Sequence, residues 1–326
     1  VDYDTAGQAI NLVYADSTNG WIPSSDIANA FDHTPPPTQK ALFGYGSTGS
    51  AVSLTNLVNS SGVVATDTIG VGSARSSLAA AGYGTDKAIF GYGYISAVSS
   101  LTNLVSNSGV VATDTSGVGT ARYGSGAASY GTDKAIFGYG YASSNVSMSN
   151  LVNNSGVVAT DVTGVGTARV ELAAANYGGD KAIFGYGETA SFVSMTNLVT
   201  NAGVIGTDVS GVGSARRGLA AASYGTDKAI FGYGYSGSDA KMSLTNLVSN
   251  IGVVGSDVTG VGTARHGLAA TNYGGDKAIF GYGINGSAAN VSLTNLVNSS
   301  GVVASDVTGV GTARSNPAAA GYSISA

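Results

Sequence analysis

The chain has 326 residues, a net charge of −5 and 50 glycines, but only 5 prolines and no cysteine. Charged residues make up 10 %, too few for a charged disordered polymer, and the acidic balance opposes nucleic-acid binding. The lack of cysteine excludes disulfides and thiolate zinc sites, and no apolar run reaches the roughly 18 to 20 residues of a membrane-spanning helix. We therefore expect a folded, turn-rich protein with no nucleic-acid partner and no membrane insertion.

Residues 1–39 differ from the rest of the chain. The stretch "AINLVYADSTNGWIP" predicts two short strands joined by a Ser-Thr-Asn-Gly turn, and "DHTPPPTQ" predicts an extended, proline-stiffened linker. Because the first residue is Val1 rather than Met, we interpret residues 1–39 as the hairpin and linker left from an upstream module.

Residues 40–326 repeat one unit six times. The phrase "KAIFGYG" or "KALFGYG" begins at residues 40, 87, 134, 181, 228 and 277, so the units are 47 to 49 residues long. Sequence periods of this length are typical of propellers and helical arrays, and the content of the unit must decide between them.

Each unit contains four short apolar segments separated by Gly, Asn, Asp or Ser. In the second unit they are "KAIFGYG", "SLTNLV", "GVVATDT" and "GAASYG", and none has the periodicity of a helix. The sequence predicts an all-β, six-bladed β-propeller of four-stranded antiparallel blades. The Ala-rich segments fit the crowded innermost position, and the C-terminal "PAAAGY" would complete the first blade and close the ring.

The glycine, aromatic and four-strand pattern resembles kelch and regulator-of-chromosome-condensation propeller repeats. The paired glycines and Trp of kelch blades are absent, so this resemblance implies the fold and not a family function. The wording "YGTDKAIFGYG…NLVSNSGVVATDTSGVGTAR" also resembles repeats of tail-fibre and other virion surface proteins of marine bacteriophages. That resemblance implies a host-facing adhesin or a structural virion part, located outside the cell or on the virion surface.

An aspartate and an arginine recur once per unit, with the arginine eight residues after the aspartate. The most economical interpretation is a structural ion pair or turn cap at the link between blades, with no metal and no cofactor. The residues are Asp67, Arg75, Asp114, Arg122, Asp161, Arg169, Asp208, Arg216, Asp257, Arg265, Asp306 and Arg314.

The units differ from one another in two stretches, after "FGYG" and after the arginine. In a four-stranded blade both stretches lie on the same face, so we expect a diversified binding surface there, with six weak sites acting together. The candidate ligand-binding residues are Tyr94, Tyr123, Tyr141, Glu171, Glu188, Arg217, Tyr235 and His266.

Three functional hypotheses follow. The first is a non-enzymatic, tail-fibre-like protein that binds a host cell-surface glycan or receptor through the variable face and other virion proteins through its N-terminal segment. It has no catalytic residue. The second is a structural virion or scaffold component that mediates protein–protein contacts. The third is a propeller glycoside hydrolase in which Glu171 and Glu188 form a carboxylate pair.

Overall fold

The computed structural model describes residues 12–17, 20–23, 39–237 and 240–323, and the chain divides into two units, Val1–Pro37 with Ala326 and Thr38–Ser325. In the first unit, β1 (Leu12–Asp16) and β2 (Gly20–Pro23) pair antiparallel. The predicted proline-rich linker at 24–38 lies outside the described residues.

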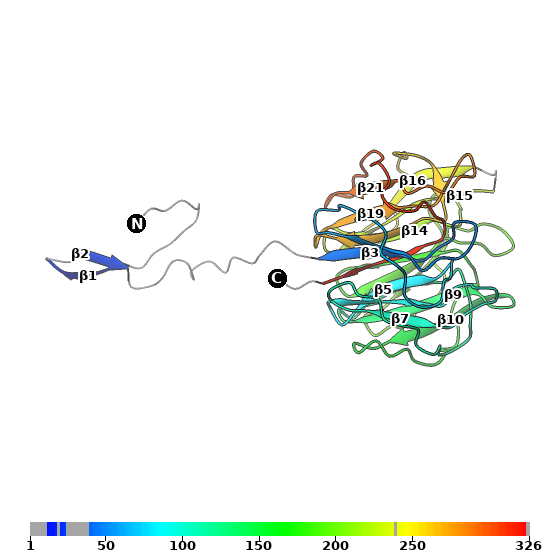
Figure 1. The fold of residues 1–326 in the computed structure, drawn as a ribbon, viewed down its shortest axis with the longest axis horizontal. Helices are drawn as coiled ribbons and strands as arrows, with labels where there is room; N and C mark the ends of the chain where they lie inside the picture. The colour runs from blue at the N-terminus through cyan, green and yellow to red at the C-terminus, as the bar shows by residue number, and fades with distance from the viewer. Residues whose placement is uncertain (1–11, 18–19, 24–38, 238–239, 324–326) are drawn as a thin grey trace. The chain divides into compact units, whose positions relative to one another are not determined.

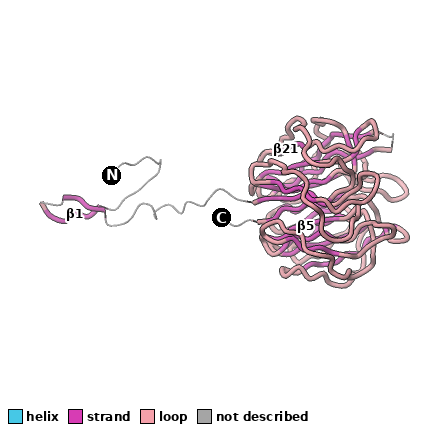
Figure 2. The backbone as a smooth tube through the Cα atoms, viewed as in Figure 1, coloured by secondary structure: helices cyan, strands magenta, loops and turns pink. Residues whose placement is uncertain are grey.

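The second unit contains a three-stranded antiparallel sheet for each sequence repeat (Figures 1 and 2). The Ala-rich strands are β5 (Ala79–Tyr83), β8 (Gly126–Tyr130), β11 (Ala173–Tyr177), β14 (Ala220–Tyr224), β18 (Ala269–Tyr273) and β22 (Ala318–Tyr322). The middle strands are β3 (Lys40–Gly44), β6 (Lys87–Gly91), β9 (Lys134–Tyr141), β12 (Lys181–Gly185), β15 (Lys228–Tyr235) and β19 (Lys277–Gly281). The outer strands are β4 (Thr55–Val58), β7 (Thr102–Val105), β10 (Asn145–Val152), β13 (Thr196–Val199), β16 (Lys241–Val248) and β21 (Thr294–Val297). The short strands β17 (Arg265–His266) and β20 (Ile284–Asn285) pair separately.

The C-terminal strand completes the first sheet, as the sequence predicts. β22 pairs antiparallel with β3, with Tyr322 opposite Lys40 and Ala318 opposite Gly44. Figure 1 shows the red C-terminal strand beside the blue β3. The first sheet is therefore assembled from both ends of the repeat region, which removes an open sheet edge.

The predicted fourth strand is not formed. In the second repeat, "GVVATDT" forms no continuous ladder with β7 and pairs with it through the isolated bridges Val105↔Val111 and Thr102↔Thr115. Between these bridges the Asn103 side chain donates to the backbone oxygen of Ala112 at 2.9 Å, so a side-chain amide occupies an acceptor that a regular ladder would use. The corresponding segments of the other repeats make the same pair of bridges.

The Ala-rich strands are neighbours of one another and are joined by two closed series of backbone hydrogen bonds. In the first axial ring, at 2.7–3.0 Å, the bonds run from Ser77 N to Asn316 O, Gly124 N to Ser77 O, Glu171 N to Gly124 O, Gly218 N to Glu171 O, Gly267 N to Gly218 O and Asn316 N to Gly267 O. In the second axial ring, at 2.7–2.9 Å, they run from Gly84 N to Asp133 O, Gly131 N to Asp180 O, Gly178 N to Asp227 O, Gly225 N to Asp276 O, Gly274 N to Gln39 O and Ser323 N to Asp86 O. This arrangement of repeated sheets is consistent with a β-propeller.

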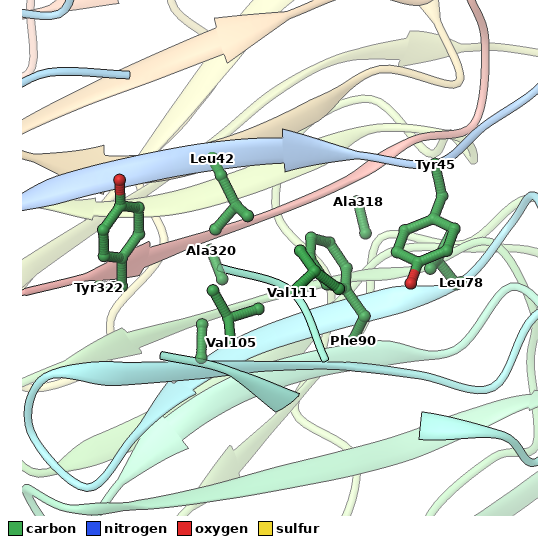
Figure 3. Close-up of a cluster of buried hydrophobic side chains, with 10 residues drawn as sticks. Leu42, Tyr45, Leu78, Phe90, Val105, Val111, Ala318, Ala320 and Tyr322 are labelled. Atoms are coloured by element: carbon green, nitrogen blue, oxygen red, sulfur yellow. The ribbon is translucent and has the colours of Figure 1, made fainter. Parts of the chain in front are cut away.

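The hydrophobic core lies between adjacent sheets rather than inside any one of them. Figure 3 shows one such layer, in which Leu42 and Tyr45 of the first sheet face Phe90 and Val105 of the second. The Tyr45 and Phe90 rings meet edge to face at 5.0 Å, a favourable aromatic geometry. Because each middle strand is covered on both sides, its residues are apolar without alternation.

A buried arginine connects each sheet to the next through an asparagine. The wholly buried Arg75 donates from Nη2 to Asn103 Oδ1 at 2.6 Å, and Asn103 Nδ2 donates to Asp114 Oδ1 at 3.0 Å. The Arg75 guanidinium also lies 4.5 Å from the centre of the Tyr45 ring. The ion pairs of this Arg–Asn–Asp network, with N–O distances of 3.7–4.0 Å, are Arg75–Asp114, Arg122–Asp161, Arg169–Asp208, Arg216–Asp257, Arg265–Asp306 and Arg314–Asp67.

Each arginine therefore contacts the aspartate of the following repeat, not the one eight residues before it in the sequence. The last pair joins Arg314 to Asp67 of the first repeat, so the network closes on itself. The asparagine and the tyrosine of this network were not singled out from the sequence. Their constancy at one position of every repeat was the available signal.

The network changes the acidity of its aspartates. Burial by itself would raise the pKa of Asp114, but hydrogen bonds from Ser73 and Asn103 and the charge of Arg75 lower it below its usual value. Burial raises the pKa of Tyr92 to about 12, so this ring stays neutral and presents its π-face to Arg122. The other network aspartates have lowered pKa values for the same reasons.

Close packing between sheets predicts a steric effect at the glycine in the fifth position of each middle strand. A Cβ added at Gly185 would lie 2.7 Å from Cζ of Phe231 in the next sheet. We expect Gly185→Ala to lower the free energy of unfolding by about 1–3 kcal/mol, as overpacked cores do. Chemical denaturation measures this change. Gly286→Ala is the matched control, because no atom lies within 4 Å of its added Cβ; equal losses in the two variants would contradict the packing argument.

The lowered aspartate pKa values predict acid sensitivity. A folded-state pKa below the unfolded value gives stability that is complete above the unfolded pKa, near 3.9, and is lost as the pH falls through the folded-state pKa. We therefore expect the midpoint temperature of thermal unfolding, measured by circular dichroism, to decrease when the pH is lowered below about 4.

Two matched variants test whether the aspartates of the network cause this loss of stability at low pH. Asp114→Asn removes a carboxylate of the network and should lower the free energy of unfolding at pH 7 by about 1.5–3 kcal/mol. Asp227→Asn removes an exposed carboxylate paired with Lys228 and should change it by less than about 1 kcal/mol. Equal effects of the two substitutions, or a midpoint unchanged down to pH 2, would refute the assignment.

Candidate binding site

The two stretches that vary between repeats lie side by side. The residue after each buried arginine pairs with the residue after the "FGYG" of the following repeat, as in Tyr123↔Tyr141 and Arg217↔Tyr235. The remaining pairs are Ser76↔Tyr94, Val170↔Glu188, His266↔Ile284 and Ser315↔Ser47. We call the surface formed by these twelve residues the variable face.

The variable face is not made of six similar sites. One pair, Ser47↔Ser315, contains only serines, whereas each of the other five pairs contains at least one aromatic or charged residue. We use the name variable arc for a set of eight residues, the eight that the sequence suggested. It consists of Tyr94, Tyr123, Tyr141, Glu188, Arg217, Tyr235 and His266 of the variable face, together with Glu171, which follows Val170 in the chain.

Three tyrosines form one end of the variable arc. The Tyr123 ring lies 5.8 Å from the Tyr94 ring and 5.4 Å from the Tyr141 ring, the latter tilted by 44°. Tyr94 keeps 43 % of its surface exposed, a large apolar area to leave in solvent. Tyr94 and Tyr123 belong to the second repeat and Tyr141 to the third, and the three rings make one continuous aromatic surface.

Tyr235 forms the other end with three partners. Its ring lies 5.8 Å from the Phe192 ring and 5.3 Å from the His266 ring, and Lys241 Nζ lies 5.4 Å from its centre. Burial, followed by the positive charges of Lys241 and Arg217, lowers the pKa of His266 below its usual value. Phe192 and Lys241 were not predicted as site residues, although both lie in the stretches that vary after "FGYG".

A charged centre joins the two ends. Arg217 Nη1 donates to Glu188 Oε2, and Arg217 Nε lies 3.5 Å from Glu171 Oε2. Burial and the nearby Glu188 raise the pKa of Glu171, and Arg217 opposes this shift. Glu171 also has a φ of 53°, a left-handed conformation that three repeats fill with glycine, so this side chain is held at a conformational cost.

These charges are the ones that break the sequence period. Between residues 40 and 326, every lysine, arginine, aspartate and glutamate lies at a position repeated from unit to unit except Glu171, Glu188, Arg217, Asp239 and Lys241. Asp239 lies outside the described residues, and the other four all belong to or contact the variable arc. Glu171 and Glu188 are the only glutamates in the chain.

A groove with a volume of about 590 Å³ lies over the charged centre. Tyr123 and Tyr141 line it, as do Glu171, Glu188 and Arg217, and Val170 adds an apolar contact. Ser143, Ser144, Asn145, Thr189 and Ala190 complete the lining. Its volume is within the range of roughly 300–1,000 Å³ typical of small-molecule sites.

The hairpins that join the Ala-rich and middle strands are much more uniform. Lys87 Nζ lies 3.0 Å from Asp86 Oδ1, and Lys181 and Lys277 make the same contact with the preceding aspartate. Such exposed pairs contribute little to stability. They repeat one structural solution and offer no distinct chemistry.

Among the described residues, no three His, Cys, Asp or Glu side chains are grouped so that they could hold a metal ion. The described part of the chain also contains no helix that is long and apolar enough to cross a membrane.

Comparison of the sequence with models of known protein families and with curated proteins finds no match. The class of the protein is therefore defined by its structure: a repeated all-β chain whose antiparallel sheets are connected by a periodic Arg–Asn–Asp network.

The charged centre makes a prediction about Glu171 that can be measured by nuclear magnetic resonance titration of its carboxyl carbon. Arg217→Met should raise the pKa of Glu171 further, because it removes the nearby positive charge. Glu188→Gln should lower that pKa, because it removes a like charge. Lys241→Met is the control and should leave the pKa unchanged; shifts in the reverse directions would show that these three groups are not coupled as described.

Proposed function

We propose that each three-stranded sheet is one blade of a six-bladed β-propeller. Six sequence repeats, six three-stranded sheets and two closed rings of backbone hydrogen bonds between the Ala-rich strands support this count. The pairing of β22 with β3 and the Arg314–Asp67 ion pair support closure between the last repeat and the first.

The protein acts, in this proposal, as a non-enzymatic binding protein whose variable face engages a glycan or other receptor on a cell surface. One observation carries the proposal: the aromatic and charged residues that depart from the repeat period gather in the variable arc, and five of them, Tyr123, Tyr141, Glu171, Glu188 and Arg217, line one groove. Tyrosine suits this role, because its large ring gives contact area with few rotatable bonds and a polar end.

We further propose that the protein is part of a virion surface, outside the cell, and that its N-terminal segment attaches it to other virion proteins. The resemblance of the repeat wording to tail-fibre and virion surface proteins supports this location. A separate hairpin unit that precedes the repeats is compatible with an attachment role.

The binding proposal is tested with immobilised glycans and whole bacterial cells. We expect the triple variant Tyr94→Ala, Tyr141→Ala and Tyr235→Ala to bind at least about tenfold more weakly. Truncation of an aromatic side chain at the centre of a binding site commonly reduces the binding free energy by more than about 1 kcal/mol. The matched control is Val110→Ala, Val157→Ala and Val204→Ala, three valines that are 61–65 % exposed and lie outside the variable face. Unchanged binding by the tyrosine triple variant would refute the site.

The same pair of variants tests a structural function. One valine per repeat is 60–65 % exposed: Val63, Val110, Val157, Val204, Val253 and Val302. In a structural role, these repeated exposed valines are the contacts that we propose for neighbouring proteins. In this alternative the valine triple variant, and not the tyrosine triple variant, would disrupt assembly of the intact particle.

We do not assign a hydrolytic role to Glu171 and Glu188, because Arg217 contacts both carboxylates. Turnover of a glycoside that disappears in both Glu171→Gln and Glu188→Gln would reverse this assignment.

A further inference from the structure

We infer that the groove of the variable arc selects a neutral pyranose and rejects acidic sugars, and that the contact of Arg217 with Glu171 and Glu188 determines this choice. The inference rests on the proposed function, since it names the ligand class of the same face. It concerns the groove lining alone and not the whole face.

The charge balance of the groove is the first argument. Two carboxylates and one guanidinium line it, so it has a net charge of −1 when both glutamates are ionised. Arg217 is the single cation of the lining, and both carboxylates already contact it. A sialic or uronic acid bound here would bring a third carboxylate against one shared guanidinium, whereas an anion-binding site needs a cation that is free to pair.

The aromatic walls are the second argument. The rings of Tyr123 and Tyr141 are inclined to each other by 44° beside the groove, so they offer two differently oriented faces. The C–H face of a pyranose packs on such a ring, and this contact needs no charge on the ligand. Val170 adds apolar surface to the lining.

Polar groups for hydroxyl recognition are the third argument. Glu171 and Glu188 offer acceptors, while Ser143 and Ser144 offer hydroxyl groups that both donate and accept. Asn145 Nδ2 donates to the backbone oxygen of Glu188 at 3.1 Å, which ties the two sides of the groove together. This mixture matches adjacent sugar hydroxyls, each of which donates and accepts.

The conformation of Glu171 is the fourth argument. Its nitrogen donates in the first axial ring, and its φ is 53°; the corresponding residues are Gly124, Gly218 and Gly267 in three repeats, and Ser77 and Asn316, with φ values of 53° and 49°, in the other two. A non-glycine residue in this region is strained, and strained residues concentrate at functional sites. The chain thus places one of its two glutamates at a position where its backbone is better suited to glycine.

The test compares paired oligosaccharides that are identical except for one terminal unit, neutral in one and sialic or uronic acid in the other. Equilibrium binding is measured with the full chain. We expect the wild-type protein to bind the neutral probe at least tenfold more tightly, and Tyr123→Ala to reduce this binding.

The double variant, with both Glu171→Gln and Glu188→Gln, keeps the shape of both side chains and leaves Arg217 without a negatively charged partner in the groove. We expect it to lose the tenfold preference or to favour the acidic probe, and Glu188→Gln alone to shift the preference in the same direction by a smaller factor. Circular dichroism and the midpoint of thermal unfolding establish that each variant is folded.

The outcomes separate the inference from the proposed function. A wild-type protein that binds the acidic probe as tightly as the neutral one, through Tyr123, overturns the inference and leaves glycan binding intact. A preference that persists in the double glutamine variant also overturns it. A protein that binds neither probe, and whose cell binding is unaffected by the tyrosine substitutions, overturns both.

Discussion

The buried arginine at each boundary between repeats is the contact on which the rest of the structure depends. A guanidinium without solvent is stable only where its charge and most of its donors are matched. At Arg75 an asparagine, an aspartate and a tyrosine ring from two different repeats do so, together with the backbone oxygens of Ser73 and Tyr92. The arginine thus fixes the position of one sheet relative to the next. It also holds the outermost segment in place, although that segment forms only isolated bridges.

This framework separates stability from recognition. Packing between sheets and the Arg–Asn–Asp network use nearly the same residues in every repeat, so their demands leave those positions little freedom. The residue that follows each arginine has no part in that network, and serine, tyrosine, valine, arginine and histidine all occupy this position. Chemical diversity is therefore concentrated next to the most constrained residue of each repeat.

Much of the fold could be predicted from the sequence, because a short period and strong turn signals determine the strands and their order. The predicted fourth strand was wrong, because the side chain of an asparagine such as Asn103 takes an acceptor of its ladder. The recurrence of this asparagine shows that the position matters, but not which acceptor its side chain takes. The pairing of Arg75 with Asp114 could not be predicted from the sequence either, because it depends on the angle between adjacent sheets. The eight predicted surface residues stay a prediction as a binding site; their unequal distribution around the face depends on which repeats are adjacent, and the expectation of six similar sites does not describe it.

The two axial rings have a consequence for how such a chain can evolve. In each ring every donor belongs to one repeat and its acceptor to a neighbour, and the bond between Ser77 and Asn316 joins the ends of the series. An array that gains or loses a single repeat must change the curvature of the whole ring or leave a donor and an acceptor unpaired. Duplication of the unit is thus restricted to certain copy numbers, whereas the variable arc can change one residue at a time. The fold can therefore change only by whole repeats, whereas binding specificity can change by single substitutions.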